Sequence, residues 1–118
     1  MSGRGLILLP GLTVMVARTF RQRLVGLLGH GALAADRAML ITPCNNIHTA
    51  FMRFAIDAVF LDEHARVLAV CPRIKPFRIA AARHARACLE MQAGRAESLD
   101  IRVGDRMAPL AQALGKPR

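Results

Sequence analysis

The sequence has no tryptophan, no tyrosine and only five phenylalanines. Aromatic platforms on which single-stranded nucleic acid stacks its bases are therefore in short supply. Acidic residues are scarce as well, with eight Asp and Glu against 17 Lys and Arg, which gives a net charge of +9. The three cysteines, an odd number, exclude a full disulfide framework and favour a reducing compartment. Apolar residues nevertheless make up 53% of the 118 residues, which excludes intrinsic disorder and fits one folded domain.

The sequence also lacks a long uninterrupted apolar run. Residues 6–17 are mostly apolar, but Pro10 and Gly11 divide them into two short pieces. Neither piece approaches the ~20 residues that a membrane-spanning helix needs, and no small-residue cleavage site of a signal peptide follows. We therefore expect two short strands here, no transmembrane segment, and a cytoplasmic protein.

The basic residues flank a less charged centre. Residues 1–37 carry a net charge of +4, residues 38–65 carry −2, residues 66–106 carry +5 and the last residues carry +2. An anionic partner fits this surplus, whether a nucleic acid, an anionic lipid or an acidic protein surface. The alternative is that the arginines only keep an apolar domain in solution.

The clearest helix signal lies over residues 19–28. Thr19 is followed three residues later by Gln22, which is the spacing of a capping box. Apolar residues then recur at helical spacing and form one stripe, which consists of Phe20, Leu24, Leu27 and Leu28. Glycines at 29 and 31 end this pattern, so we expect one amphipathic helix near the N-terminus.

Most of the remaining chain has the short apolar runs of strands. We expect strands over residues 12–16, 38–42, 47–53, 55–61, 66–71 and 87–91, a hairpin turn over 62–65 and a short helix over 94–99. Residues 55–61 are nearly all apolar, as in a central strand buried on both faces. This pattern predicts an α+β fold. We expect a lead over residues 1–10, one domain over 11–110 and a loose tail over 111–118.

Four segments, in order, resemble a bacterial and archaeal family called domain of unknown function 192. They are GLTVMVARTFRQRLVGLLG (residues 11–29), CNNIHTAFMRFAIDAVFLD (44–62), CLEMQAG (88–94) and IRVGD (101–105). The resemblance implies a compact, mostly β, barrel-like sheet. It implies no activity, because none is established for the family. Two positions depart from the family pattern: His64-Ala65 stands where the hairpin turn usually contains glycine, and Ala55 stands where proline is usual.

The richest polar cluster lies between residues 44 and 57. Cys44, His48 and Asp57 are the parts of a thiol nucleophile, its base and the group that orients the base, so they are candidate catalytic residues. The same residues, with His84, are types that bind zinc, but the paired spacings of a zinc site are missing, and we expect no metal and no cofactor. The third interpretation is a buried structural Cys44 and a His48 bonded to the backbone.

We expect a binding or accessory domain more than an enzyme, with a small or peptide-like anionic ligand. The expected site is the turn and strand after Cys44, where polar groups interrupt apolar sequence. Its candidate ligand-binding residues are Asn45, Asn46, His48, Thr49 and Arg53. An enzyme that uses Cys44, His48 and Asp57 is the first alternative.

A nucleic-acid-binding protein is the second alternative. Residues 73–86 form a basic stretch without an acidic residue. Phe77 lies among its cations in the sequence, which are Arg73, Lys75, Arg78, Arg83 and Arg86. Such a patch fits contacts to phosphates, although the segment matches no helix-turn-helix, zinc-finger or RNA-recognition motif. The alternative interpretation is a solvated, arginine-rich loop or helix, because a run of charge alone identifies no ligand.

Buried or half-buried polar residues complete the expectations. Asp57 interrupts an apolar strand, so we expect it to be buried, ionised and hydrogen-bonded, because an unpaired buried carboxylate is costly. We expect Glu90 to face water and to have an arginine partner. Cys71 and Cys88 are expected as small core residues, and Asp105 is expected to close a turn through its side chain.

Overall fold

The computed structural model describes residues 6–19, 22–23, 34–50 and 52–114. Within these residues the strands are β1 (Leu6–Leu9), β2 (Leu12–Ala17), β3 (Arg37–Ile41), β4 (Asn46–His48), β5 (Ile56–Leu61), β6 (Val67–Ile74), β7 (Ile79–Ala81) and β8 (Ala87–Gln92). The helices are α2 (Arg95–Ser98) and the short 3₁₀ helix η1 (Ala108–Ala113). The domain is therefore mostly β, as the family resemblance implies.

Six of the strands form one mixed sheet in the order β1-β2-β3-β8-β5-β6. The β2–β3 pair is parallel, and the other neighbouring pairs are antiparallel. Strand β5 lies between β8 and β6, and all six of its residues are buried. This confirms the central strand that the apolar run over 55–61 predicts.

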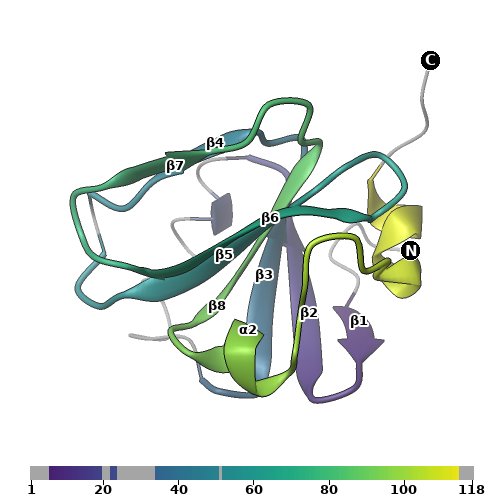
Figure 1. Cartoon of the computed structure of the whole chain (residues 1–118), viewed down its shortest axis with the longest axis horizontal. Coiled ribbons are helices and arrows are strands. Elements are labelled where there is room, and N and C mark those ends of the chain that lie inside the picture. The colour runs from purple at the N-terminus through teal and green to yellow at the C-terminus, as the bar shows by residue number, and fades with distance from the viewer. Residues whose placement is uncertain (1–5, 20–21, 24–33, 51, 115–118) are drawn as a thin grey trace.

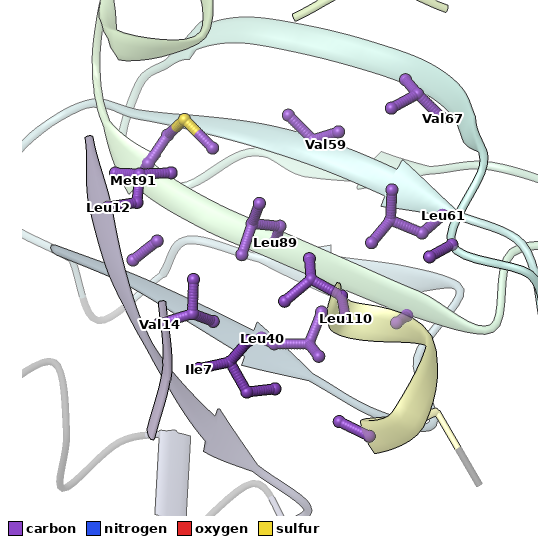
Figure 2. Close-up of a cluster of buried hydrophobic side chains, with 14 of the residues drawn as sticks. Ile7, Leu12, Val14, Leu40, Val59, Leu61, Val67, Leu89, Met91 and Leu110 are labelled. Atoms are coloured by element: carbon purple, nitrogen blue, oxygen red, sulfur yellow. The ribbon is translucent and has the colours of Figure 1, made fainter. Parts of the chain in front are cut away.

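Alternating residues of the central strands fill two cores, one on each face of this sheet. In β5, Val59 and Leu61 belong to the first core, while Ala58 and Phe60 belong to the second. Figure 2 shows the first core, where strand residues pack together with Leu110 of η1. The first core is thus closed by the C-terminal part of the domain.

Strands β4 and β7 form a separate two-stranded antiparallel sheet that covers the second core (Figure 1). Ile47 of β4 and its partner Ala80 of β7 pack against this core. We call residues 44–55 and 75–86, which include both strands and their flanking loops, the β4–β7 layer. The last residue of the layer is hydrogen-bonded to β5, because the Arg86 N–H donates to the Leu61 carbonyl at 2.7 Å.

The hairpin between β5 and β6 has its turn where the sequence predicts it, at residues 62–65. Asp62 Oδ1 accepts hydrogen bonds from the N–H groups of His64 at 2.8 Å and Arg66 at 2.9 Å. Ala65 has a φ of 64°, in the left-handed region that favours glycine. Its methyl group is completely buried in the first core, so the packing of this group supports an alanine at the strained position.

The helices of the described residues both follow β8, and α2 confirms the short helix predicted over 94–99. The amphipathic helix predicted over 19–28 lies mostly outside the described residues, but the residues that begin it are within them. The Gln22 N–H donates to Thr19 Oγ1 at 3.0 Å, and the Arg18 N–H donates to Gln22 Oε1 at 2.6 Å. The Thr19 side chain therefore accepts from the backbone N–H three residues later, as in a capping box, whereas the Gln22 side chain accepts from the Arg18 N–H and not from that of Thr19.

Two expectations about the sheet were wrong. The sheet does not close into a barrel, because β1 and β6 are its two edges in the described part of the chain. The strand expected over 47–53 ends at His48, because the N–H and carbonyl of Thr49 bond to the loop before β7 instead of continuing the ladder. Ile7 of β1 and Leu114, which directly follows η1, are both buried residues of the first core.

Candidate functional site

The outer surface of the β4–β7 layer carries polar residues that the sequence singles out. Asn46 lies opposite Ala81, and His48 lies opposite Ile79. All four side chains are exposed, because side chains alternate along a strand and the intervening pair packs into the second core. The expected ligand segment therefore lies on the outward face of a small sheet.

The turn before β4 is bonded within itself. Cys44 Sγ donates to the Asn46 carbonyl at 3.1 Å, and Asn46 Nδ2 donates to Asn45 Oδ1 at 2.8 Å. Burial is the main cause that raises the pKa of the Cys44 thiol, and the negative charge of Glu90 adds to it. A thiol with a raised pKa supplies less of the thiolate that nucleophilic catalysis requires.

Thr49, a candidate ligand-binding residue, is completely buried and acts as an anchor. Its Oγ1 donates to the Lys75 carbonyl at 2.7 Å and accepts from the Arg78 N–H at 2.9 Å. Its backbone N–H donates to the Arg78 carbonyl at 2.9 Å, and its carbonyl accepts from the Phe77 N–H at 3.1 Å. One threonine therefore holds the loop over residues 75–78 against the segment that follows β4.

The expected ligand segment and most of the basic stretch, which lie apart in the sequence, form one surface. The β4–β7 layer contains five Lys and Arg and no Asp or Glu. Arg86 pairs with Glu63 of the β5–β6 turn at an N–O distance of 3.4 Å. The other cations of the layer are exposed and form no ion pair among the described residues; they are Arg53, Lys75, Arg78 and Arg83. Arg73 lies in β6, outside the layer, and pairs with Glu97 at 3.5 Å.

Asp57 is completely buried, as its place in an apolar strand predicts. Its carboxylate accepts three hydrogen bonds from backbone N–H groups: Arg73 at 2.8 Å, Gly94 at 3.0 Å and Ala96 at 2.9 Å. Burial of a carboxylate is tolerated when such donors satisfy it. Asp57 thus joins β6 to the beginning of α2.

The six-stranded sheet separates Asp57 from the other two candidate catalytic residues. Asp57 shares a face of β5 with first-core residues, whereas His48 lies in the layer over the second core and Cys44 packs against that core. Among the residues that the structure describes, no group of three or more His, Cys, Asp or Glu side chains is placed to hold a metal ion. The structure therefore does not gather the Cys44, His48 and Asp57 set at one place.

A buried ion pair lies beneath the layer. Glu90 of β8 is 0% exposed and Arg23 is 4% exposed, and Arg23 Nη2 lies 2.6 Å from Glu90 Oε2. Arg23 Nε also donates to Glu90 Oε1 at 3.1 Å, and Nη2 donates to the His48 carbonyl at 3.1 Å. The arginine partner expected for Glu90 is confirmed. The expectation that Glu90 faces water was wrong, because its face of β8 is the one that the second core and the layer cover.

Arg23 connects three parts of the chain through this ion pair. It contacts β8 through Glu90 and β4 through His48, and it lies itself in the segment after β2. Burial raises the pKa of Glu90, while the hydrogen bond and positive charge of Arg23 oppose that rise. Arg23 and Glu90 are 67 residues apart in the sequence, which is why local patterns did not reveal the pair.

All three cysteines are free thiols. Cys88 is completely buried, and this burial raises the pKa of its thiol well above the ordinary value. Cys71 is half-buried and packs against the second core, and burial raises its pKa as well. Both fit the core role that the sequence predicts.

An open cavity of about 460 Å³ lies away from the layer, between the β1–β2 turn, the segment after α2 and the start of η1. Its lining is mostly apolar, and its charged members are Asp105 and Arg106. Asp105 accepts from the Arg102 N–H at 2.9 Å, which confirms the predicted turn closure, and Arg106 Nε donates to the His64 carbonyl at 3.0 Å. Both charged groups are thus engaged by the backbone.

Residues 9–109 match the family model of DUF192, described as an Uncharacterized ACR. The chain belongs to the DUF192 family. The match confirms the resemblance carried by the four sequence segments, and it covers the whole six-stranded sheet except the first residues of β1. No curated protein matches the chain.

Two solved structures have the same fold as this DUF192 domain. A protein of Sinorhizobium meliloti 1021, described as a "putative transcription regulator", is 25% identical with a TM-score of 0.70, over 86% of this chain and 87% of that one. A protein of unknown function from Novosphingobium aromaticivorans DSM 12444 is 20% identical with a TM-score of 0.69, over 86% of this chain and 80% of that one. In the described part of the DUF192 chain, no helix has the length and apolar character needed to cross a membrane.

Proposed function

We propose that this DUF192 domain is a non-enzymatic protein that binds nucleic acid through the outer surface of the β4–β7 layer. One observation carries the proposal. The layer has no acidic residue, and four of its exposed cations form no ion pair among the described residues: Arg53, Lys75, Arg78 and Arg83. Cations without acidic partners are available to replace the counterions along a phosphate backbone.

An extended polyanion fits this surface better than a small ligand. Sites for small molecules are concave and gather a few polar groups toward one point. Asn46 and His48 instead point outward from a two-stranded sheet, and Thr49 is buried and bonded to backbone groups. The cations spread from the loop before β7 to Arg83 in the turn after it. Such a strip matches the repeated charges of a nucleic acid strand.

The similar protein of Sinorhizobium meliloti adds support. It is 25% identical to this chain over most of both lengths, and a role in transcription is compatible with a nucleic-acid ligand. The enzyme alternative has less support, because burial raises the pKa of Cys44 and Asp57 is engaged by backbone donors on the other side of the sheet. A peptide-like anionic ligand would use the same cations, so it is an outcome of the experiment.

The experiment is a fluorescence anisotropy titration of labelled oligonucleotides at a series of KCl concentrations. If all four cations contact phosphates, the logarithm of the affinity should fall with the logarithm of the salt concentration with a slope of roughly 3 to 4. Arg78→Gln should reduce the magnitude of this slope by about 1, because one phosphate contact is lost. Arg37→Gln, which removes an exposed arginine at the start of β3, is the matched control and should leave the slope unchanged.

Two results would contradict the proposal. One is an affinity that does not depend on salt or does not change in Arg78→Gln. The other is an acidic peptide of similar charge that binds more tightly than the oligonucleotides, which would favour the peptide-like ligand.

A further inference from the structure

Phe77 combines two unfavourable features. Its side chain is 73% exposed, although phenylalanine is normally a core residue. Its φ is 63°, in the left-handed region that bulky residues rarely adopt. Such conformations persist only where the surrounding structure enforces them, and they concentrate at sites of binding and catalysis. A glycine here would avoid both features, so the exposed ring is the part that needs an explanation.

The structure holds the backbone of Phe77 in place from below. The Thr49 carbonyl accepts the Phe77 N–H at 3.1 Å. Thr49 Oγ1 bonds on both sides of it, because it donates to the Lys75 carbonyl and accepts from the Arg78 N–H. Thr49 itself is completely buried. The backbone of Phe77, and with it the direction of its Cα–Cβ bond, is therefore set before any partner arrives, which lowers the entropy lost on binding.

Cations lie close to Phe77 in the chain and at the same end of the molecule. Lys75 and Arg78 lie in the same loop, which joins β6 to β7 at the left end of the molecule in Figure 1. Arg53 lies in the segment between β4 and β5, which reaches the same end. An aromatic face among cations is the arrangement that binds a nucleic acid base together with its flanking phosphates.

We propose that Phe77 stacks on a base and that the partner of this DUF192 domain is single-stranded nucleic acid. The inference rests on the nucleic-acid function proposed above and specifies the form of the nucleic acid. A base can stack on a protein ring only when it is free of its neighbours in the strand, so the ring favours single strands and loops over a duplex. Lys75 and Arg78 contact the phosphates on either side of the stacked base. Among the described residues of the layer, Phe54 packs against the second core and Phe77 is exposed, so the proposed stacking position is the Phe77 ring.

The fixed backbone distinguishes this partner from an anionic lipid surface. Ile79, the first residue of β7, is 79% exposed, so the loop and the start of β7 together present two apolar side chains, as a membrane contact also does. Burial of apolar groups in lipid is non-directional and gains nothing from one enforced backbone conformation. Stacking depends on the direction from which a ring is presented, and Thr49 fixes the backbone from which the Phe77 ring projects.

The test uses the absence of tryptophan from the natural chain. Phe77→Trp introduces one tryptophan at the proposed stacking position, and Val103→Trp introduces one at another exposed apolar position as the matched control. The two tryptophan positions lie at opposite ends of β6. The N–H of Gly104, which follows Val103, donates to the Val67 carbonyl at the start of β6, whereas Phe77 follows the end of β6. We expect an oligothymidine strand to quench the fluorescence of the Phe77→Trp protein and to leave that of the Val103→Trp protein unchanged.

Affinities of two further variants separate the ring from the loop. Phe77→Gly suits the positive φ and removes the ring, so its melting temperature should be at least that of the natural protein. Its affinity for the single strand should nevertheless fall by about 5- to 150-fold, the range for loss of one stacked base. Its weaker affinity for the corresponding duplex should remain within about twofold, because phosphate contacts alone supply it. Ile79→Ala should weaken single-strand binding less than Phe77→Gly does.

Each contrary outcome has a defined meaning. Salt-dependent binding that Phe77→Gly does not weaken, or weakens equally for single strand and duplex, overturns the stacking role and leaves the proposed function standing. Equal losses in Ile79→Ala and Phe77→Gly also overturn stacking, because they indicate non-directional apolar contact. A blue shift of the Phe77→Trp protein on phosphatidylserine vesicles, without quenching by oligothymidine, assigns the loop to a lipid surface. The absence of any oligonucleotide binding overturns both proposals.

Discussion

Arg23→Met is expected to destabilise the fold strongly, because it leaves the carboxylate of Glu90 buried without its charge partner. Glu90 is 0% exposed, and Arg23 donates to both of its oxygens at 2.6–3.2 Å. Breaking a buried ion pair by removing one partner costs about 3–5 kcal/mol. For a domain of this size that corresponds to a melting temperature roughly 12–20 °C lower. The loss is a large part of the ~5–15 kcal/mol that stabilises a typical domain.

The assay is unfolding by heat and by urea, followed by circular dichroism. Arg18→Met is the matched control, because Arg18 is an exposed arginine at the start of the same segment, and this variant should melt close to the natural protein. Replacing both Arg23 and Glu90 with methionine should recover much of the loss, because the buried charge is then absent. The recovery should be incomplete, since the His48 carbonyl still loses its hydrogen bond from Arg23.

The pH dependence gives a second readout with a defined sign. Burial raises the pKa of Glu90 and Arg23 opposes that rise, so removing Arg23 raises the pKa of Glu90 further. At a pH between the pKa of Glu90 in the unfolded chain and its raised pKa in the folded variant, Glu90 holds a proton only in the folded state. The unfolding free energy of the variant therefore rises as the pH falls toward the ordinary pKa of a glutamate. The destabilisation by Arg23→Met should therefore be smaller at about pH 5 than at about pH 8. A variant that melts within about 2 °C of the natural protein at both pH values would refute the reasoning.

Two further predictions concern groups on either side of the sheet. Asp57→Asn keeps the shape of the side chain but turns one acceptor into a donor that faces backbone N–H groups, so it should lower the unfolding free energy by about 1–3 kcal/mol. Urea unfolding measures this change, with Asp36→Asn as the exposed control. A midpoint for Asp57→Asn that equals the midpoint of this control would contradict the prediction. Burial disfavours the thiolates of both Cys88 and Cys44, and alkylation followed by peptide mass spectrometry tests this. Cys88 should react only when the protein unfolds, and the pH dependence of Cys44 labelling should give an apparent pKa above that of a free thiol. Fast labelling of native Cys44 near neutral pH would support the enzyme alternative.

The elements that local sequence determines were predictable from it. The continuous apolar run of β5 indicated burial on both faces, and the residues 62–65 indicated a turn that the Asp62 carboxylate closes. The spacing of Thr19 and Gln22 indicated a capping contact, and the structure contains the hydrogen bond from the Gln22 N–H to Thr19 Oγ1. Each of these signals depends on residues within a few positions of one another, so no knowledge of the tertiary contacts was needed.

The candidate site depended on contacts between distant residues, and these were not predictable. Alternation in β8 placed Glu90 on one face of the strand, but only the tertiary fold determines that a second layer covers that face. Thr49 looked like a polar group available to a ligand, because its bonds to residues 75–78 cross 26 to 29 positions of sequence. The basic stretch looked like one segment, whereas the structure divides its cations between β6, the exposed loop before β7 and the segment between β7 and β8. The left-handed backbone of Phe77 had no signal in the residue type, which rarely adopts it.

The division of the strands into two sheets has consequences for local unfolding of the domain and for the effect of substitutions on its stability. The β4–β7 ladder consists of three residue pairs and shares no ladder with the six-stranded sheet in the described part of the chain. Short, exposed units of this kind open at a lower free energy than a central strand such as β5. The amides of Ile47 and Ala80 should therefore exchange with solvent well before those of Val59 and Leu89, without global unfolding. Because the outward-facing side chains of this layer are exposed, substitutions there should leave the packed sheet beneath them intact.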